Sequence, residues 1–178
     1  MYMLPCLFLV VILTVSCRND MDKVHFFDPQ NLPHQSLDTV RMVRSTNGNL
    51  QLLVSAPKVV VRDDKEKKTE YPDGFSLQFF DRSDKPVAVI SADYAYSLDE
   101  KKIIEARRNV VVIDYRSGDT SYLESIVWDS PQGRIYSNDP VKSVNGQRVT
   151  YGDGFESDEN FTTSQITHQR GTIQLKDD

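Results

Sequence analysis

The residue types that most often carry out catalysis are few and scattered in this chain. Of the three histidines, His25 and His34 lie near the N-terminus and His168 stands alone in the C-terminal part. The segment Gly152-Asp153-Gly154 suggests phosphate binding, but it lacks the third glycine and the following helix of that motif. Ser164 has no base beside it in the sequence. We therefore expect a domain that is not an enzyme and that uses no metal or cofactor.

Acidic residues and the net charge narrow the possible ligands further. Asp153, Glu156, Asp158 and Glu159 have suitable chemistry for calcium, yet their spacing fits no EF-hand loop. An acidic bend at the surface is the simpler interpretation. The net charge is −5, and no basic stripe with interleaved aromatic residues occurs in the sequence. Nucleic acid is therefore not expected as a partner.

One cysteine does indicate specific chemistry. Residues 1–16 are uncharged, mostly apolar and shorter than the roughly 20 residues of a membrane-spanning helix, which fits a signal peptide. The segment Thr14-Val15-Ser16-Cys17 resembles a bacterial lipobox, although Thr14 replaces the usual Leu and no basic residue precedes the apolar run. We expect a signal peptide at 1–16 and a tether at 17–37, attached to a membrane through lipid on Cys17. An uncleaved membrane anchor is the alternative.

The elements that follow the tether have the pattern of β-strands. Phe75-Ser76-Leu77-Gln78-Phe79 alternates apolar and polar residues, which is typical of a half-buried strand. Asn145-Gly146 lies between two such runs and predicts a hairpin. No window of eleven or more residues has helical periodicity. Residues 38–178 are therefore expected to form an all-β jellyroll or sandwich.

A repeat is superimposed on this strand pattern. Val110, Val141 and Thr172 each open an alternating run, and they are spaced 31 residues apart. Repetition at such a period indicates one unit used several times and stacked on its neighbours. The result would be an elongated sheet structure with a groove along it and unpaired strands at its two ends. Unpaired strands are natural docking sites for a partner.

The order and spacing of several segments resemble the LptC family, the periplasmic, membrane-tethered components of lipopolysaccharide export. The resemblance covers about Asp38 to Leu175. Its segments are Tyr71–Phe75, Ser91–Tyr96, Asn109–Val112, Leu123, Trp128-Asp129, Gly133–Ser137, Pro140-Val141 and Gly152–Asp158. A lipoprotein signal in place of the family's transmembrane anchor looks like the variant of Bacteroides-like bacteria.

The resemblance implies a fold, a cargo and partners. The fold would be a twisted, V-shaped, elongated β-jellyroll with an apolar groove. An ABC transporter in the inner membrane would push lipopolysaccharide into the groove, and LptA-like jellyrolls bridging the periplasm would receive it. Each buried methylene is worth about 0.8 kcal/mol, so a continuous apolar groove would keep the acyl chains covered. The chain would lie at the periplasmic face of the inner membrane and hydrolyse nothing.

Site residues follow from this expectation. Inward-facing residues of the central strands should contact acyl chains: Phe75, Leu77, Phe79, Tyr94, Tyr96, Ile126, Trp128 and Phe155. The first strand, with Asp38, Val40 and Met42, should pair with the jellyroll of the transporter permease. The last strand, with Thr172, Ile173 and Leu175, should accept the bridge protein by strand addition. Gly152 and Gly154 should permit a bend or a close approach of backbone.

The sequence is also compatible with two other functions. A lipoprotein that scaffolds an envelope complex without carrying lipid would have a fully filled core. A carbohydrate-binding sandwich would need exposed aromatic residues in one patch, whereas the aromatic residues here mostly alternate with polar neighbours.

Overall fold

The computed structural model describes residues 35–62 and 67–175, which contain fourteen antiparallel β-strands and no helix. The prediction of an all-β jellyroll is confirmed. The chain divides into two units, residues 1–32 and 33–178, and the fold below is that of the second. The predicted signal peptide, Cys17 and most of the predicted tether lie outside the described residues. None of the described residues belongs to a helix that could cross a membrane.

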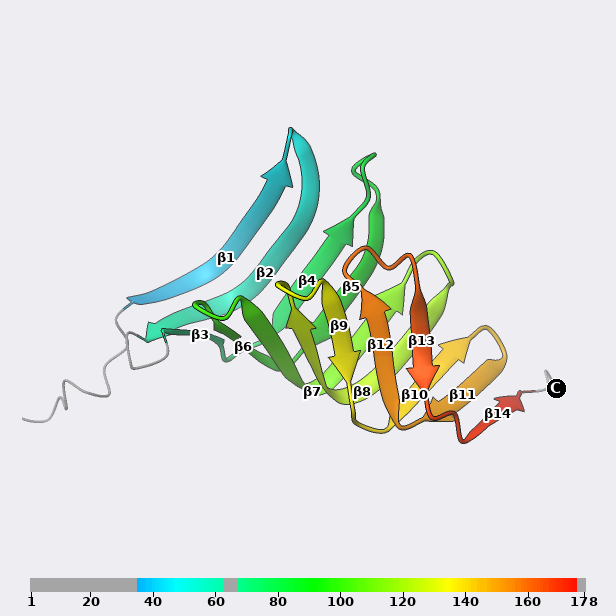
Figure 1. The fold of residues 1–178 in the computed structure, drawn as a ribbon. Coiled ribbons are helices and arrows are strands. Elements are labelled where there is room, and N and C mark those ends of the chain that lie inside the picture. Colours follow the sequence, from blue (N-terminus) through cyan, green and yellow to red (C-terminus); the bar gives the residue numbers. More distant parts are fainter. Residues whose placement is uncertain (1–34, 63–66, 176–178) are drawn as a thin grey trace, which may run out of the picture. The chain divides into compact units, whose positions relative to one another are not determined.

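The strands follow one another with short connections (Figure 1). In chain order they are β1 (Gln35–Thr46), β2 (Asn49–Arg62), β3 (Lys68–Tyr71), β4 (Phe75–Phe80), β5 (Pro86–Ala92), β6 (Tyr94–Leu98), β7 (Ile103–Asp114), β8 (Asp119–Asp129), β9 (Arg134–Ser137), β10 (Val141–Asn145), β11 (Arg148–Gly152), β12 (Gly154–Asp158), β13 (Ser164–Thr167) and β14 (Gly171–Gln174). β1 begins at Gln35, inside the segment expected to be tether.

All strands belong to one sheet that folds over into two facing walls. The first wall has the order β1-β2-β4-β5-β7-β8-β10-β11-β14. The second wall has the order β2-β3-β6-β7-β8-β9-β12-β13. β2, β7 and β8 are long enough to run through both walls, so they hold the walls together along the fold line.

Local sequence explains where the sheet bends. Pro57 interrupts β2 at the fold line, where a missing backbone N–H breaks the ladder. Arg108 and Asn109 have positive φ angles of 65° and 52° in β7, where the pairing register with β8 shifts. Asn tolerates this conformation better than most residues, and the shift is a β-bulge that sharpens the bend.

Polar side chains link neighbouring strands along the fold line. Asn109 Nδ2 donates to Asp93 Oδ2 at 2.6 Å, between β7 and the β5–β6 junction. Ser125 Oγ donates to Asp139 Oδ2 at 2.6 Å, between β8 and the β9–β10 connection. Farther along, Asp153 pairs with the guanidinium of Arg170. The bend is thus fixed by aspartates as well as by the backbone.

The 31-residue repeat is the interval at which the chain recrosses this fold line in the same direction. Val110 resumes pairing in β7 after the bulge, Val141 opens β10, and Thr172 lies in β14. Each repeat carries the chain out and back along the first wall and then out and back along the second. The period is therefore the length of four wall segments with their turns.

Gly152 and Gly154 flank the bend at Asp153. A Cβ atom on Gly152 would lie 2.7 Å from the carbonyl oxygen of Thr167, and one on Gly154 would lie 2.8 Å from that of Ser137. Both distances are shorter than real Cβ contacts, and backbone oxygens cannot swing away as a flexible side chain can. The predicted close approach of backbone at these two positions is confirmed.

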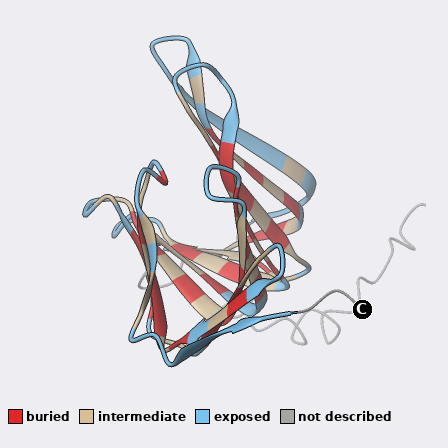
Figure 2. Cartoon of the chain, turned by 90° about the vertical axis from the view of Figure 1, so that its right-hand side faces the viewer, coloured by how far each residue is buried: buried red, intermediate tan, exposed pale blue. Residues whose placement is uncertain are grey.

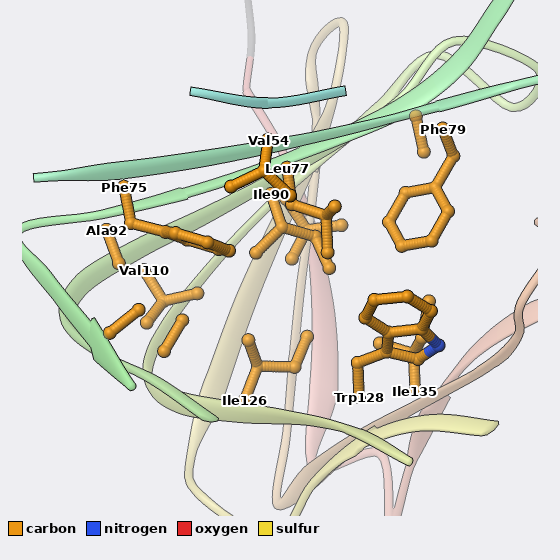
Figure 3. Packing of buried hydrophobic residues seen from close by; sticks show 14 of the residues in the cluster. Val54, Phe75, Leu77, Phe79, Ile90, Ala92, Val110, Ile126, Trp128 and Ile135 are labelled. Atoms are coloured by element: carbon orange, nitrogen blue, oxygen red, sulfur yellow. The ribbon is translucent and has the colours of Figure 1, made fainter. Parts of the chain in front are cut away.

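The core lies between the two walls. Along the central strands buried positions alternate with intermediate ones, while the connections at the far ends of the strands are largely exposed (Figure 2). Side chains from β2, β4 and β5 face side chains from β7, β8 and β9 across the interior (Figure 3). The inner faces therefore form both the stabilising core and the candidate site.

Candidate functional site

The apolar half of the interior lies between β2, β4 and β5 on one wall and the second-wall parts of β7 and β8 on the other. Six of the eight residues predicted to contact lipid lie here or at its border: Phe75, Leu77, Phe79, Ile126, Trp128 and Phe155. They are buried, Leu77 being only 1% exposed. Tyr71 lies among them, and its burial together with the nearby Asp99 carboxylate raises its pKa to about 12. The phenol therefore stays neutral.

Tyr94 and Tyr96 do not face this interior, and their predicted orientation is wrong. Ala95, which is 0% exposed, takes the inward position between them. The chain turns at Asp93 between β5 and β6, so the alternation that places Ala92 inward does not continue in phase. The two tyrosines lie instead on the outer face of the second wall, where their ring centroids are 6.3 Å apart.

The outer face around these tyrosines is an ion-pair network. Glu70 Oε1 accepts from Lys68 Nζ at 2.8 Å and Glu70 Oε2 from Arg62 Nε at 2.9 Å. Burial raises the pKa of Glu70, but the hydrogen bonds and charges of Lys68 and Arg62 outweigh it and lower the pKa to about 2. Lys68 Nζ also lies 4.5 Å from the centroid of the Tyr96 ring. These contacts join β2, β3 and β6 and are structural.

A side chain that sequence analysis missed closes the open side of the apolar half. Phe161, in the connection between β12 and β13, is 2% exposed and lies 5.4 Å from the Phe79 ring. Phe79 in turn meets the Trp128 ring edge-on at 5.7 Å. Asp158 orders the connection by accepting from the backbone N–H of Thr163 at 2.9 Å. The only signal in the sequence is one phenylalanine between polar residues.

Arg44 spans the same opening from β1. Its Nη2 donates to Glu159 Oε1 at 3.0 Å, and its guanidinium lies 5.3 Å from the centroid of the Trp128 ring. Trp128 Nε1 is buried and has no hydrogen-bond partner among the described residues. We call Arg44, Phe79, Trp128, Glu159 and Phe161 the mouth cluster. The cluster therefore joins β1, β4, β8 and the β12–β13 connection.

The side chains that line the interior become polar toward the C-terminal strands. Along one inner row of the first wall, Leu77, Ile90 and Val112 are followed by Ser121, Ser143, Thr150 and Thr172 on successive strands. A cavity of about 310 Å³ opens beside these hydroxyl groups. The expectation of an apolar groove along the whole interior is therefore wrong, because β8, β10, β11 and β14 present small polar residues inward.

The residues predicted to dock partners lie on strands with one unpaired side, except Leu175, which directly follows β14. β1 pairs with β2, and β14 pairs with β11, and neither has a second neighbour among the described strands. Asp38, Met42, Ile173 and Leu175 are exposed, whereas Val40 packs against the core and Thr172 lines the cavity. Both ends of the first wall thus offer a free edge.

The groups with catalytic chemistry occupy structural positions. Ser164 Oγ donates to Asp114 Oδ2 at 2.7 Å and so ties β13 to β7 across the interior. The acidic residues considered for calcium each make another contact: Asp153 with Arg170, Glu156 with Arg134, Asp158 with Thr163 and Glu159 with Arg44. Within residues 35–62 and 67–175 no group of three potential ligands could hold a metal ion.

Comparison with known proteins adds no relative. No model of a known protein family matches this chain. No curated protein is similar to it in sequence either.

Proposed function

We propose that this domain carries lipopolysaccharide, without enzymatic activity, in an LptC-like step of export to the outer membrane. It would receive the molecule from an inner-membrane ABC transporter and pass it to an LptA-like bridge. The observation that carries the proposal is the apolar half of the interior, which lies between two sheet walls and is closed on its open side by the mouth cluster.

The physics of the cargo fits such an interior. Each methylene that leaves water gains about 0.8 kcal/mol, so an amphiphile with several acyl chains needs a covered path between membranes. The inward rows of β2, β4 and β5 offer Val54, Leu77 and Ile90 to such chains. Those side chains fill the interior in this structure, so acyl chains would enter only as the walls separate or Phe161 withdraws.

The free edges fit the proposed partners. A permease jellyroll would add a strand to β1, and an LptA-like jellyroll would add a strand to β14, each through backbone hydrogen bonds. Exposed apolar side chains on both edges, Val43 on β1 and Ile173 on β14, would be covered by these additions. Lipid on Cys17 would hold the domain at the periplasmic face of the inner membrane.

Photo-crosslinking in cells tests the cargo. A reactive amino acid is placed in turn at Leu77, Gln78 and Phe79, which alternate between the inner and outer faces of β4. We expect lipopolysaccharide adducts at Leu77 and Phe79 and none at Gln78. Gln78 is the matched control, because it lies on the same strand and faces away from the interior. Absence of adducts at all three positions, in a folded and tethered protein, would contradict lipid transport.

A scaffold that carries no lipid is the second candidate function. The observation that favours it is the close filling of the apolar half by its own side chains, Leu77 and Ile90 being almost inaccessible. A scaffold would give no lipid adduct in the experiment above and would still bind its partners through β1 and β14.

A further inference from the structure

The cavity near the C-terminal strands lies between the two walls but differs in chemistry from the apolar half. Its residues come from β7, β8 and β10 to β14, and its volume of about 310 Å³ is at the lower end of the range for small-ligand sites. No described side chain fills it as Phe79 and Trp128 fill the mouth.

Paired hydroxyl groups form one side of this cavity. Ser121 Oγ donates to Ser143 Oγ at 3.0 Å, and both serines are almost fully buried. Thr150 and Thr172 approach each other on the next two strands, with 3.3 Å between their Oγ1 atoms. Each hydroxyl has one donor and two acceptor positions, so one mutual hydrogen bond leaves capacity for a ligand.

This lining disfavours an acyl chain. The cavity is lined by the hydroxyl groups of Ser121, Ser143 and Thr150 and by the carboxylate of Asp114. A methylene chain would exclude water from these groups and could form no hydrogen bond with them in its place. Covering a polar group without a new hydrogen bond is unfavourable. Acyl chains therefore fit the apolar half better than the cavity. The cavity is better suited to a ligand that carries hydroxyl groups of its own.

The charges disfavour an anion. Asp114 and Asp119 both line the cavity, against a single guanidinium, that of Arg148. Arg148 has no carboxylate partner among the described residues, but two carboxylates outweigh it, so a phosphate group would meet net repulsion. Neutral hydroxyl groups can donate to these carboxylates and accept from Arg148.

Apolar side chains also line the cavity. Val112, Phe155 and Ile166 lie there beside the polar side chains of Ser164, Gln165 and Gln169. A sugar ring has the same two-sided character, with hydroxyl groups around its edge and C–H bonds on its faces. The hydroxyl row would bind the edge, and the three apolar side chains would contact a face.

We propose that this cavity binds a neutral sugar unit. Resting on the proposed function, the inference assigns acyl chains to the apolar half and a sugar of the same glycolipid to the cavity. The interior would then match both parts of an amphiphile at once.

Calorimetric titration of the full chain with two probes tests the proposal. The first probe is an oligosaccharide of neutral sugars from lipopolysaccharide, freed of acyl chains, phosphates and acidic sugars, and the second is inorganic phosphate. We expect the oligosaccharide to bind and phosphate not to bind. The double substitution Ser121→Ala/Ser143→Ala removes both partners of one hydrogen bond and should weaken oligosaccharide binding at least tenfold.

A matched pair of serines provides the control. Ser76 and Ser91 pair across β4 and β5 on the outer face of the same wall, so Ser76→Ala/Ser91→Ala should leave binding unchanged. If the first double variant does not fold, Thr150→Val removes a single cavity hydroxyl with little change in shape and should also weaken binding.

The outcomes separate this inference from the proposed function. Lipopolysaccharide adducts at Leu77 without oligosaccharide binding would overturn the sugar site and leave lipid transport standing. Oligosaccharide binding that depends on Ser121 and Ser143, without adducts at Leu77 or Phe79, would support the sugar site and contradict lipid transport. Binding of phosphate alone would overturn the assignment of a neutral ligand.

Discussion

At the scale of single residues, Glu70 on the outer face of the second wall makes the stability of the fold depend on pH. Its folded pKa of about 2 is lower than the value of 4.5 expected when unfolded, so its stabilising contribution is complete above about pH 4.5. That contribution is lost as the pH falls from about 4.5 toward 2. Glu70→Gln should remove about 1 kcal/mol of this pH-dependent stability, a figure reduced for solvent screening.

Urea unfolding followed by Trp128 fluorescence between pH 7 and pH 2.5 measures the effect of Glu70→Gln. Glu100→Gln is the control, because Glu100 pairs with Lys67 in a bridge where both side chains are 62% exposed. An equal loss of pH dependence in both variants would show that Glu70 has no special role.

Gly154 gives a second prediction at this scale. Gly154→Ala places a Cβ atom 2.8 Å from the carbonyl oxygen of Ser137, and relief of this clash requires movement of backbone. The free energy of unfolding should fall by about 2 kcal/mol. Gly171→Ala is the matched control, since nothing lies within 4 Å of the position of its Cβ. A loss at Gly154 no larger than at Gly171 would contradict the close approach.

The sequence predicts correctly which residues face the interior within one strand, but not across a bend. Alternation in β4 places Phe75, Leu77 and Phe79 on one face, as the structure has them. The same reasoning fails for Tyr94 and Tyr96, because one residue at the fold line reverses which side of the chain faces inward. Asp93 has no property in the sequence that distinguishes a bend between walls from an ordinary turn.

At the scale of elements, the β12–β13 connection governs access to the apolar half. Phe161→Ala removes the buried ring that covers Phe79 and should lower the free energy of unfolding by about 3 kcal/mol. It should also raise the yield of lipopolysaccharide adducts at Leu77, because acyl chains would no longer have to displace the ring.

Phe80→Ala is the control for this connection, because Phe80 is half-buried on β4 and outside the apolar cluster. It should cost less stability and leave the adduct yield unchanged. Lower stability of Phe161→Ala without a higher yield would mean that Phe161 only fills space.

Elements themselves were largely predictable, and their boundaries were not. The turn at Asn145-Gly146 and the 31-residue repeat both correspond to observed features. β1 extends to Gln35, because a polar segment forms a strand when an existing edge, here β2, supplies the hydrogen bonds. The buried position of Phe161 depends on contacts with Phe79 that no local pattern encodes.

At the scale of the whole folded unit, the interior has two chemistries that the sequence did not reveal. Alternating Ser and Thr in β8, β10 and β11 resemble the solvent face of any strand, and only the pairing shows that Ser121, Ser143 and Thr150 point inward. A sequence pattern identifies which residues share a face. It does not identify which faces meet, because that depends on where the sheet folds.

The direction of transport gives the last prediction. Deletion from Thr172 onward removes most of β14, whose residues are all exposed and absent from the core cluster, so the fold should survive. Binding to the bridge protein should be lost because its strand template is gone, while binding to the transporter through β1 persists. Lipopolysaccharide that enters and cannot leave should then raise the adduct yield at Leu77, measured beside pull-down of each partner. Retained bridge binding, or an unchanged yield, would contradict an exit at β14.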